Sequence, residues 1–156
     1  FKPENILEIR IGLNFKTSAI KTGNKSASIL TLDKATESNK QTRNLIDQDN
    51  LDTVKVENNR FSKTLSKCSE NRQFDFIFFD ENHTKKATLD YFEACLKSIH
   101  NDSFFIFDNI YRTAEIQKAW SIIKKHSKVT VTVDVFYLGI VFFRKEQAKE
   151  HFKIRV

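Results

Sequence analysis

Phe76-Ile77-Phe78-Phe79-Asp80 and Phe104-Phe105-Ile106-Phe107-Asp108 are two apolar runs, and each of them ends in an aspartate. A strand that is apolar at every position has both faces buried, so it belongs in the middle of a parallel sheet with helices on both sides. The carboxyl ends of neighbouring parallel strands meet at one edge of a sheet. The two runs therefore predict an α/β fold with both aspartates side by side at that edge.

Outward from these runs, strand-like and helix-like segments alternate along the chain, which predicts a doubly wound α/β sheet. Helical spacing of apolar residues marks 84–100 and the stretch that begins at Thr113, and a weaker, polar helix is expected over 34–50. The last two strands are too close together for a crossover helix, so they should form an antiparallel hairpin. The tail 151–156 alternates polar and apolar residues, like an edge strand or a docked arm. The predicted strands are 5–11, 28–33, 53–57, 74–79, 103–107, 129–136 and 138–144.

The composition limits which class of protein this chain can be, but it does not indicate which kind of molecule it binds. The chain has 156 residues, 40% of them hydrophobic, and a net charge of +6, which indicate one domain over 1–156. The basic residues gather near the two ends, where a solvated face is the simplest interpretation. No membrane-spanning run or signal peptide is visible, so we expect a cytoplasmic protein. A homodimer is compatible with these features. Since Phe1 lies almost directly before the first strand, we expect an N-terminal helical segment to be lacking.

The two cysteines, Cys68 and Cys95, lie in unrelated segments, and Cys95 falls on the apolar face of a predicted helix. A buried free thiol is the expected state of Cys95, rather than a disulfide or a metal ligand.

The end of the first strand, Leu7-Glu8-Ile9-Arg10-Ile11-Gly12-Leu13-Asn14, resembles motif I of class I S-adenosylmethionine (SAM)-dependent methyltransferases. In that motif, glycines let the backbone approach the cofactor. Gly12 is retained, whereas Arg10 and Asn14 stand where small residues are usual. Five parallel strands followed by a terminal hairpin are also the strand plan of this Rossmann-like, seven-stranded fold. The resemblance implies that Glu8 and Gly12 contribute to cofactor binding.

Other strand ends supply further cofactor-binding candidates. Asp33 ends the second strand, where an acid suits the ribose hydroxyls, although it also reads as an acid at a helix N-terminus. Asn59 and Arg60 fall after the third strand, where methyltransferases contact adenine. Asp80, at the end of the fourth strand, is the last of the cofactor-binding candidates.

The loops after the fourth and fifth strands resemble the metal site of catechol O-methyltransferase-type enzymes. Three oxygen donors, Asp80, Asp108 and Asn109, suit Mg²⁺, which keeps water or substrate at its remaining positions. In that family the metal lowers the pKa of the acceptor hydroxyl and orients its attack on the SAM methyl group. The family's general-base lysine lies three residues beyond the first aspartate, and here His83 holds that position.

Alternative interpretations stay open at this stage. Asp80 and Asp108 are also plausible helix caps, and His83 reads equally well as part of a helix entry. Three further histidines, His100, His126 and His151, have no partner visible in the sequence and are expected at the surface. Tyr111 and Arg112 are candidates for the acceptor pocket.

The leading hypothesis is a SAM-dependent, Mg²⁺-assisted O-methyltransferase acting on a small hydroxylated molecule. A second is a methyltransferase-fold binding module without catalysis, which Arg10 and Asn14 favour. A nucleic-acid methyltransferase ranks last, because the basic chain ends are its sole support.

Overall fold

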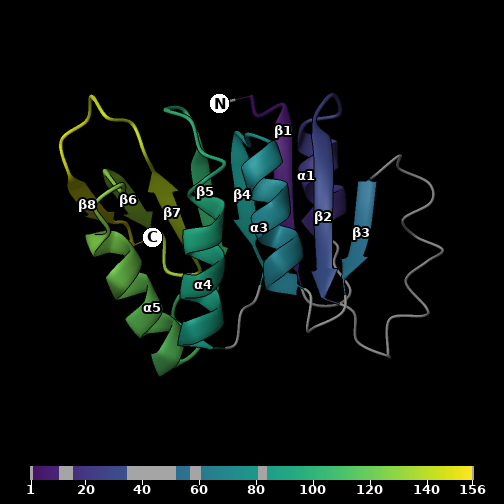
Figure 1. Ribbon diagram of the computed structural model, residues 1–156. Helices are drawn as coiled ribbons and strands as arrows, with labels where there is room; N and C mark the ends of the chain where they lie inside the picture. The colour runs from purple at the N-terminus through teal and green to yellow at the C-terminus, as the bar shows by residue number, and fades with distance from the viewer. Residues whose placement is uncertain (1, 11–15, 35–51, 57–60, 81–83, 156) are drawn as a thin grey trace.

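The computed structural model describes residues 2–10, 16–34, 52–56, 61–80 and 84–155 (Figure 1). Eight strands and four helices alternate along these residues. In chain order they are β1 (Asn5–Arg10), α1 (Lys16–Gly23), β2 (Ser28–Lys34), β3 (Asp52–Val56), α3 (Phe61–Asn71), β4 (Phe76–Phe79), α4 (Lys85–Cys95), β5 (Phe104–Asp108), α5 (Ala114–Lys125), β6 (Val131–Asp134), β7 (Leu138–Phe142) and β8 (Glu150–Lys153).

The strands form one mostly parallel sheet in the order β3-β2-β1-β4-β5-β7-β6-β8. Pairs from β3 to β5 are parallel, β7 lies antiparallel between β5 and β6, and β8 pairs parallel with β6. The α/β fold and the terminal hairpin predicted from the sequence are confirmed. The tail adds an eighth strand at the edge, one of the two arrangements that its alternating pattern predicted.

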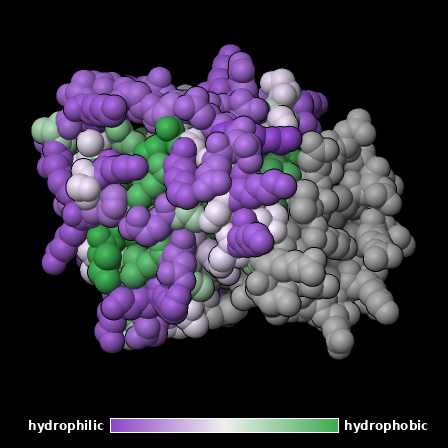
Figure 2. Space-filling model, viewed as in Figure 1, coloured by the Kyte–Doolittle hydropathy of each residue, from purple (hydrophilic) through white to green (hydrophobic). Residues whose placement is uncertain are grey.

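Helices cover the two faces of the sheet unequally (Figure 1). Helices α3, α4 and α5 lie on the near face, over a large core that includes Leu7, Ile77 and Phe105. Helix α1 lies on the far face, where Ile20 packs against a smaller cluster with Ile29. The near face is mainly hydrophilic over the described residues, with hydrophobic surface in its left part (Figure 2). The helices thus turn their apolar sides to the sheet and their polar sides outward.

The many phenylalanines of the central strands pair across the sheet. Phe76 lies opposite Phe104 in the β4–β5 register, and Phe79 lies opposite Phe107. The rings of these two pairs stack, with centroids 4.8 Å and 4.3 Å apart. Cross-strand aromatic pairs stabilise a sheet. The two apolar runs therefore align β4 with β5 and bring their carboxyl ends level.

Several predicted boundaries were wrong. A helix was expected over 34–50, but Lys34 is the last residue of strand β2. The rest of that range lies outside the described residues. Helices α1 and α3 were not predicted. The strands β4, β6 and β7 are shorter than expected, and Asp108 is the last residue of β5 rather than the first beyond it. Cys95 is a buried free thiol, as predicted.

None of the described helices is long and apolar enough to cross a membrane.

Candidate active site

Asp80 and Asp108 follow directly from the register of β4 and β5 and lie side by side at the carboxyl edge of the sheet. The parallel strands end on the lower side of the sheet in Figure 1. The register that pairs Phe79 with Phe107 makes them neighbours, and each side chain is only 9% exposed. The backbone N–H of Asp80 donates to the Ile9 carbonyl at 2.8 Å, which joins this loop to the end of β1. The ends of three adjacent strands, β1, β4 and β5, thus meet at the two carboxylates.

Helix capping does not explain these aspartates. Thr84 is the N-cap of α4, where its hydroxyl accepts from the Ala87 N–H, and Thr113 caps α5 by accepting from Ile116. Threonine caps satisfy the first free N–H groups of both helices. Asp80 and Asp108 precede these caps in the chain, so their carboxylates are available for another role.

Lys16, the first residue of α1, holds the two carboxylates together. Its Nζ donates to Asp80 Oδ1 at 2.6 Å and also to Asp108 Oδ2. Partial burial opposes the charge on Lys16, but the hydrogen bonds and attraction of the two carboxylates outweigh it and raise the lysine pKa. Sequence reasoning missed Lys16. The carboxylate pair binds a cation in this structure, and that cation is a lysine ammonium.

Asn109 adds the third predicted metal ligand to the same place. Its backbone has a φ of 51°, in the left-handed region that asparagine tolerates, and its Nδ2 donates to Asp108 Oδ2 at 2.9 Å. The predicted triad is therefore brought together. Among the described residues no group of three or more His, Cys, Asp or Glu side chains could hold a metal ion. The amide oxygen of Asn109 is a hard donor that could join the two carboxylates as a third ligand.

Glu8 lies inside the molecule rather than on the surface of the site. Its carboxylate is fully buried and accepts from the hydroxyls of Thr17, at 2.6 Å, and Thr31, at 2.9 Å. Burial raises the pKa of Glu8, while Thr17, Arg10 and Thr31 oppose that rise. The predicted direct contact between Glu8 and a cofactor does not fit this placement. Glu8 instead ties β1 to α1 and β2 through these two hydroxyls.

Arg10 is the unusual residue of that turn. It is 2% exposed, and its Nη1 donates to Thr17 Oγ1 at 3.2 Å. An arginine side chain therefore occupies interior space at a position where the resemblance to motif I had suggested a small residue.

Other predicted residues are only partly placed or are not placed. Asp33 lies on β2 opposite Arg10, at the same edge as the aspartates. Gly12, Asn59, Arg60 and His83 lie outside the described residues.

A hollow of about 370 Å³ opens beside the aspartate pair. It is lined by Asn109, Tyr111, Arg112, Phe136 and Tyr137. The ring of Tyr111 stacks on that of Phe136, and its hydroxyl donates to Asp134 Oδ2 at 2.5 Å. That hydrogen bond raises the pKa of Tyr111. Tyr111 and Arg112, expected in the acceptor pocket, do line a hollow next to Asn109.

The histidines outside the site have partners that the sequence did not reveal. His100 Nε2 lies 2.8 Å from Asp75 Oδ1, His126 Nε2 lies 3.5 Å from Glu93, and His151 Nδ1 lies 2.9 Å from Thr132 Oγ1. His100 is half-buried. The expected surface position is confirmed for His151, which is exposed, whereas His100 and His126 are partly buried. Their partners come from distant parts of the chain, which is why the sequence did not show them.

The strand order, with β7 inserted antiparallel beside five parallel strands, and the acidic site at the carboxyl edge define a class I methyltransferase fold. Residues 14–110 match the family model described as "Methyltransferase domain". The chain belongs to this family.

Solved structures with this fold share little sequence with the chain. A provisionally assigned caffeoyl-CoA O-methyltransferase from Staphylococcus aureus is 14% identical, with 90% of this chain and 76% of that chain covered and a TM-score of 0.70. The O-methyltransferase from Bacillus cereus, in complex with S-adenosylhomocysteine (SAH), is 21% identical over 90% and 74%, with a TM-score of 0.67.

The MycE methyltransferase of the mycinamycin pathway, in complex with Mg, SAH and mycinamycin VI, is 14% identical over 90% of this chain and 44% of that one, with a TM-score of 0.65. No curated protein matches. At these identities the similarity concerns the fold.

Proposed function

We propose that this methyltransferase transfers the methyl group of SAM to a hydroxyl of a small molecule, and that Mg²⁺ assists the transfer. One observation carries the proposal: Asp80 and Asp108 share a single cation at the carboxyl ends of adjacent parallel strands. Ligands of open α/β sheets bind at this edge. Two solved structures with the same fold support the proposal: an O-methyltransferase in complex with SAH, and a methyltransferase in complex with Mg, SAH and mycinamycin VI.

The carboxylate pair suits a divalent cation chemically. Two carboxylates and the amide oxygen of Asn109 are hard oxygen donors, and the two acids already hold one positive charge. Asp80, Asp108 and Asn109 would hold Mg²⁺, which when bound lowers the pKa of an acceptor hydroxyl. The side chains of both aspartates are little exposed, so their charges act through a less screened medium than water.

The remaining residues of the chain would orient the reactants. SAM, when bound, supplies a methyl group on a sulfonium. Asp33 would accept from ribose hydroxyls, with Gly12, Asn59 and Arg60 around the cofactor, as the resemblance implies. Asp80 also lies next to the end of β1, where the cofactor would bind in this proposal. His83 would take the proton of the acceptor hydroxyl.

The hollow beside Asn109 is the acceptor site in this proposal. Asn109 lines it and also donates to Asp108, so a hydroxyl in the hollow would lie close to the acidic pair. Tyr111, Phe136 and Tyr137 give it apolar walls, and Arg112 adds a positive charge. A volume of about 370 Å³ is in the range of small-molecule pockets.

Calorimetry with SAH, followed by methyl transfer to a panel of hydroxylated small molecules, tests this function. We expect SAH to bind with micromolar affinity, and turnover to need Mg²⁺ and to stop in EDTA. A chain that binds no SAH at millimolar concentration would refute the proposal. Turnover that persists in EDTA would refute its metal part alone.

A second candidate is a methyltransferase-fold binding module without catalysis. The buried Arg10 favours it, because a large side chain fills a position of the turn that is usually small. SAH binding separates the two functions: tight binding together with turnover excludes the inactive module, whereas no binding favours it.

A further inference from the structure

The Lys16 ammonium lies between Asp80 and Asp108, at the place that a metal ion bridging Asp80 Oδ1 and Asp108 Oδ2 would occupy. It contacts one oxygen of each carboxylate. Mg²⁺ binds its oxygen ligands at about 2.0–2.1 Å and requires near-octahedral geometry. Two oxygens that both hydrogen-bond one ammonium cannot at the same time enclose a metal ion at that distance. Lys16 and a metal ion bound through these same two oxygens therefore exclude each other.

We propose that Lys16 is a tethered cation that holds the Asp80–Asp108 pair together when no divalent metal is bound, and that Mg²⁺ binds by displacing it. This inference rests on the metal assignment in the proposed function. It makes Lys16 the residue that sets the metal affinity of the site.

Charge explains why the pair needs a cation at all times. Two little-exposed carboxylates at neighbouring strand ends repel each other, and each makes ionisation of the other harder. One ammonium leaves a net charge of −1 on the three groups, whereas a divalent ion would bring two carboxylates to zero. The pair therefore favours the doubly charged ion for an equal number of contacts.

The covalent link between Lys16 and the rest of the chain favours the ammonium over a free metal ion. A short flexible connection gives a group an effective concentration in the millimolar range or above. Lys16 lies on α1 of the same chain, so free Mg²⁺ has to compete with an ammonium that is always nearby. Metal binding thus becomes an exchange between two cations, and removal of the ammonium should strengthen it.

Lys16 is placed so that it can leave. Its side chain is 42% exposed, in contrast to the two aspartates. It is the first residue of α1, and the N-terminus of a helix carries a partial positive charge that disfavours a lysine. In this structure the attraction of the two carboxylates outweighs this unfavourable interaction with the helix end. When a metal ion neutralises them, the ammonium loses the attraction of these two carboxylates while the helix end still repels it.

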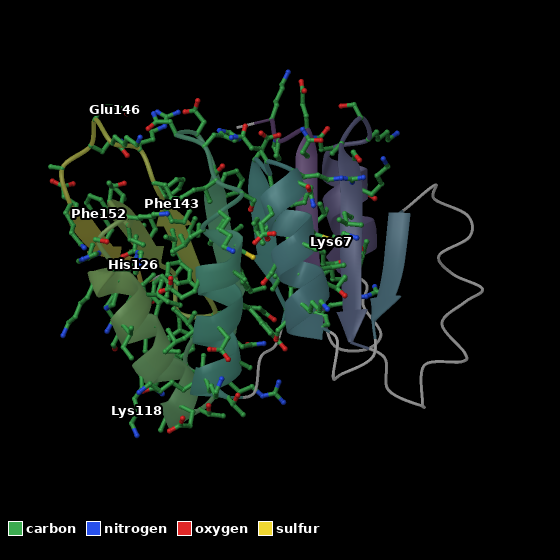
Figure 3. All side chains as sticks on the ribbon, in the orientation of Figure 1. Lys67, Lys118, His126, Phe143, Glu146 and Phe152 are labelled. Atoms are coloured by element: carbon green, nitrogen blue, oxygen red, sulfur yellow. The ribbon has the colours of Figure 1, made fainter. Side chains whose placement is uncertain are left out.

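Metal affinity tests the exchange directly, with Mn²⁺ as an EPR-visible probe and Mg²⁺ as its competitor. Lys16→Gln removes the ammonium, and Lys67→Gln is the matched control, because Lys67 is an exposed lysine on α3 (Figure 3). We expect Lys16→Gln to bind Mn²⁺ at least tenfold more tightly than wild type, with Lys67→Gln equal to wild type. Addition of Asp108→Asn to Lys16→Gln should abolish the gain. Equal or weaker Mn²⁺ binding by Lys16→Gln, or no binding by any of these proteins, would overturn the inference.

Chemical labelling of wild type gives a second readout that needs no variant. Brief acylation followed by mass spectrometry reports how accessible each lysine amine is. Saturating Mg²⁺ should raise the acylation rate of Lys16 at least fivefold and leave that of Lys67 unchanged. A Lys16 rate that does not respond to Mg²⁺ would contradict displacement, even if Lys16→Gln fails to fold.

SAH titration of the same samples keeps this inference separate from the proposed function. Loss of SAH binding with the Lys16 effect intact would refute the methyltransferase activity and leave the cation exchange standing. SAH binding without any Lys16 effect would do the reverse.

Discussion

Asp75 and His100 face each other across the amino-terminal edge of the sheet, with Asp75 Oδ1 2.8 Å from His100 Nε2. The other oxygen of Asp75 accepts from the backbone N–H groups of Glu4, at 2.7 Å, and Asn5, at 2.8 Å. Partial burial opposes the charge of Asp75, but these donors outweigh it and hold the pKa of Asp75 below its ordinary value. Asp75 thus fastens the start of β1 to the loop before β5, at the edge opposite the active site.

Asp75→Ala should therefore lower the free energy of unfolding by about 1–3 kcal/mol at pH 7. Since the pKa of Asp75 is lower in the folded chain, its stabilisation is present at neutral pH and is lost as the pH falls through that lowered value. Urea unfolding of wild type and variant between about pH 7 and pH 3 measures both effects. The gap between the two proteins should shrink below about pH 4. Asp102→Ala, at an exposed aspartate, is the control, and a gap that does not change with pH would contradict the assignment.

Gly139 is required by the packing of α5 on the sheet. A Cβ at this position would lie 2.7 Å and 2.8 Å from two ring atoms of Trp120 and 3.0 Å from Ile110 Cγ2. Trp120 is buried, so its ring cannot simply swing away. Gly139→Ala should lower the free energy of unfolding by about 1–3 kcal/mol, as overpacking of a core does.

Gly23→Ala is the matched control for this effect, because nothing lies within 4 Å of a Cβ added there. Thermal unfolding of both variants should show a lower Tm for Gly139→Ala and a nearly unchanged Tm for Gly23→Ala. Equal Tm values would show that Trp120 adapts without cost.

Asp108→Ala should reduce Mg²⁺-dependent turnover by more than about 100-fold, since loss of a ligand exceeds the 10–100-fold effects of residues that only support ligands. Stability should change little, because the substitution also relieves repulsion from Asp80. Steady-state kinetics and circular dichroism measure the two effects. Asp90→Ala removes a surface aspartate that pairs with Lys86 on α4 and should leave turnover intact. A variant at Asp108 with wild-type turnover would remove this residue from the metal site.

Tyr137→Ala tests the acceptor hollow. Tyr137 lines the hollow and is 67% exposed, so its removal should leave the fold intact. We expect the KM for the acceptor to rise about tenfold, with the affinity for SAH unchanged, because in a hydrophobic pocket even one missing methylene costs about 1–3 kcal/mol. Phe152→Ala is the control, since Phe152 is an exposed aromatic residue on β8 at the left edge of the sheet (Figure 3). An unchanged KM in Tyr137→Ala would place the acceptor elsewhere.

The sequence predicted the features that a local pattern encodes. Continuous apolar runs revealed β4 and β5, and the short interval before Leu138 predicted the β6–β7 hairpin. Because the strand ends follow from these elements, the proximity of Asp80, Asp108 and Asn109 could also be predicted. Helix α1 was missed because its eight residues are mostly polar. Helix α3 was missed although Phe61, Leu65 and Cys68 recur at helical spacing, so its signal was present.

Long-range partners could not be predicted. Lys16 is 64 residues from Asp80 and 92 from Asp108, and no spacing in the sequence links them. The same holds for Glu8 with Thr31 and for His100 with Asp75, which meet only when the sheet assembles. Motif I suggested that Glu8 contacts the cofactor. A sequence pattern shows which type of residue is present but not whether its side chain points into the core, so it could not show that Glu8 is buried.

Strand β8 has a consequence for how the protein avoids association with itself. A sheet edge offers unpaired N–H and C=O groups to other chains, and short edge strands with charged side chains discourage such pairing. β8 is four residues long, all four are exposed, and three of them are Glu150, His151 and Lys153. Without it, the edge would be β6, whose sequence is Val131-Thr132-Val133-Asp134. With its short length and charged side chains, β8 has the features by which sheet edges discourage pairing with other chains.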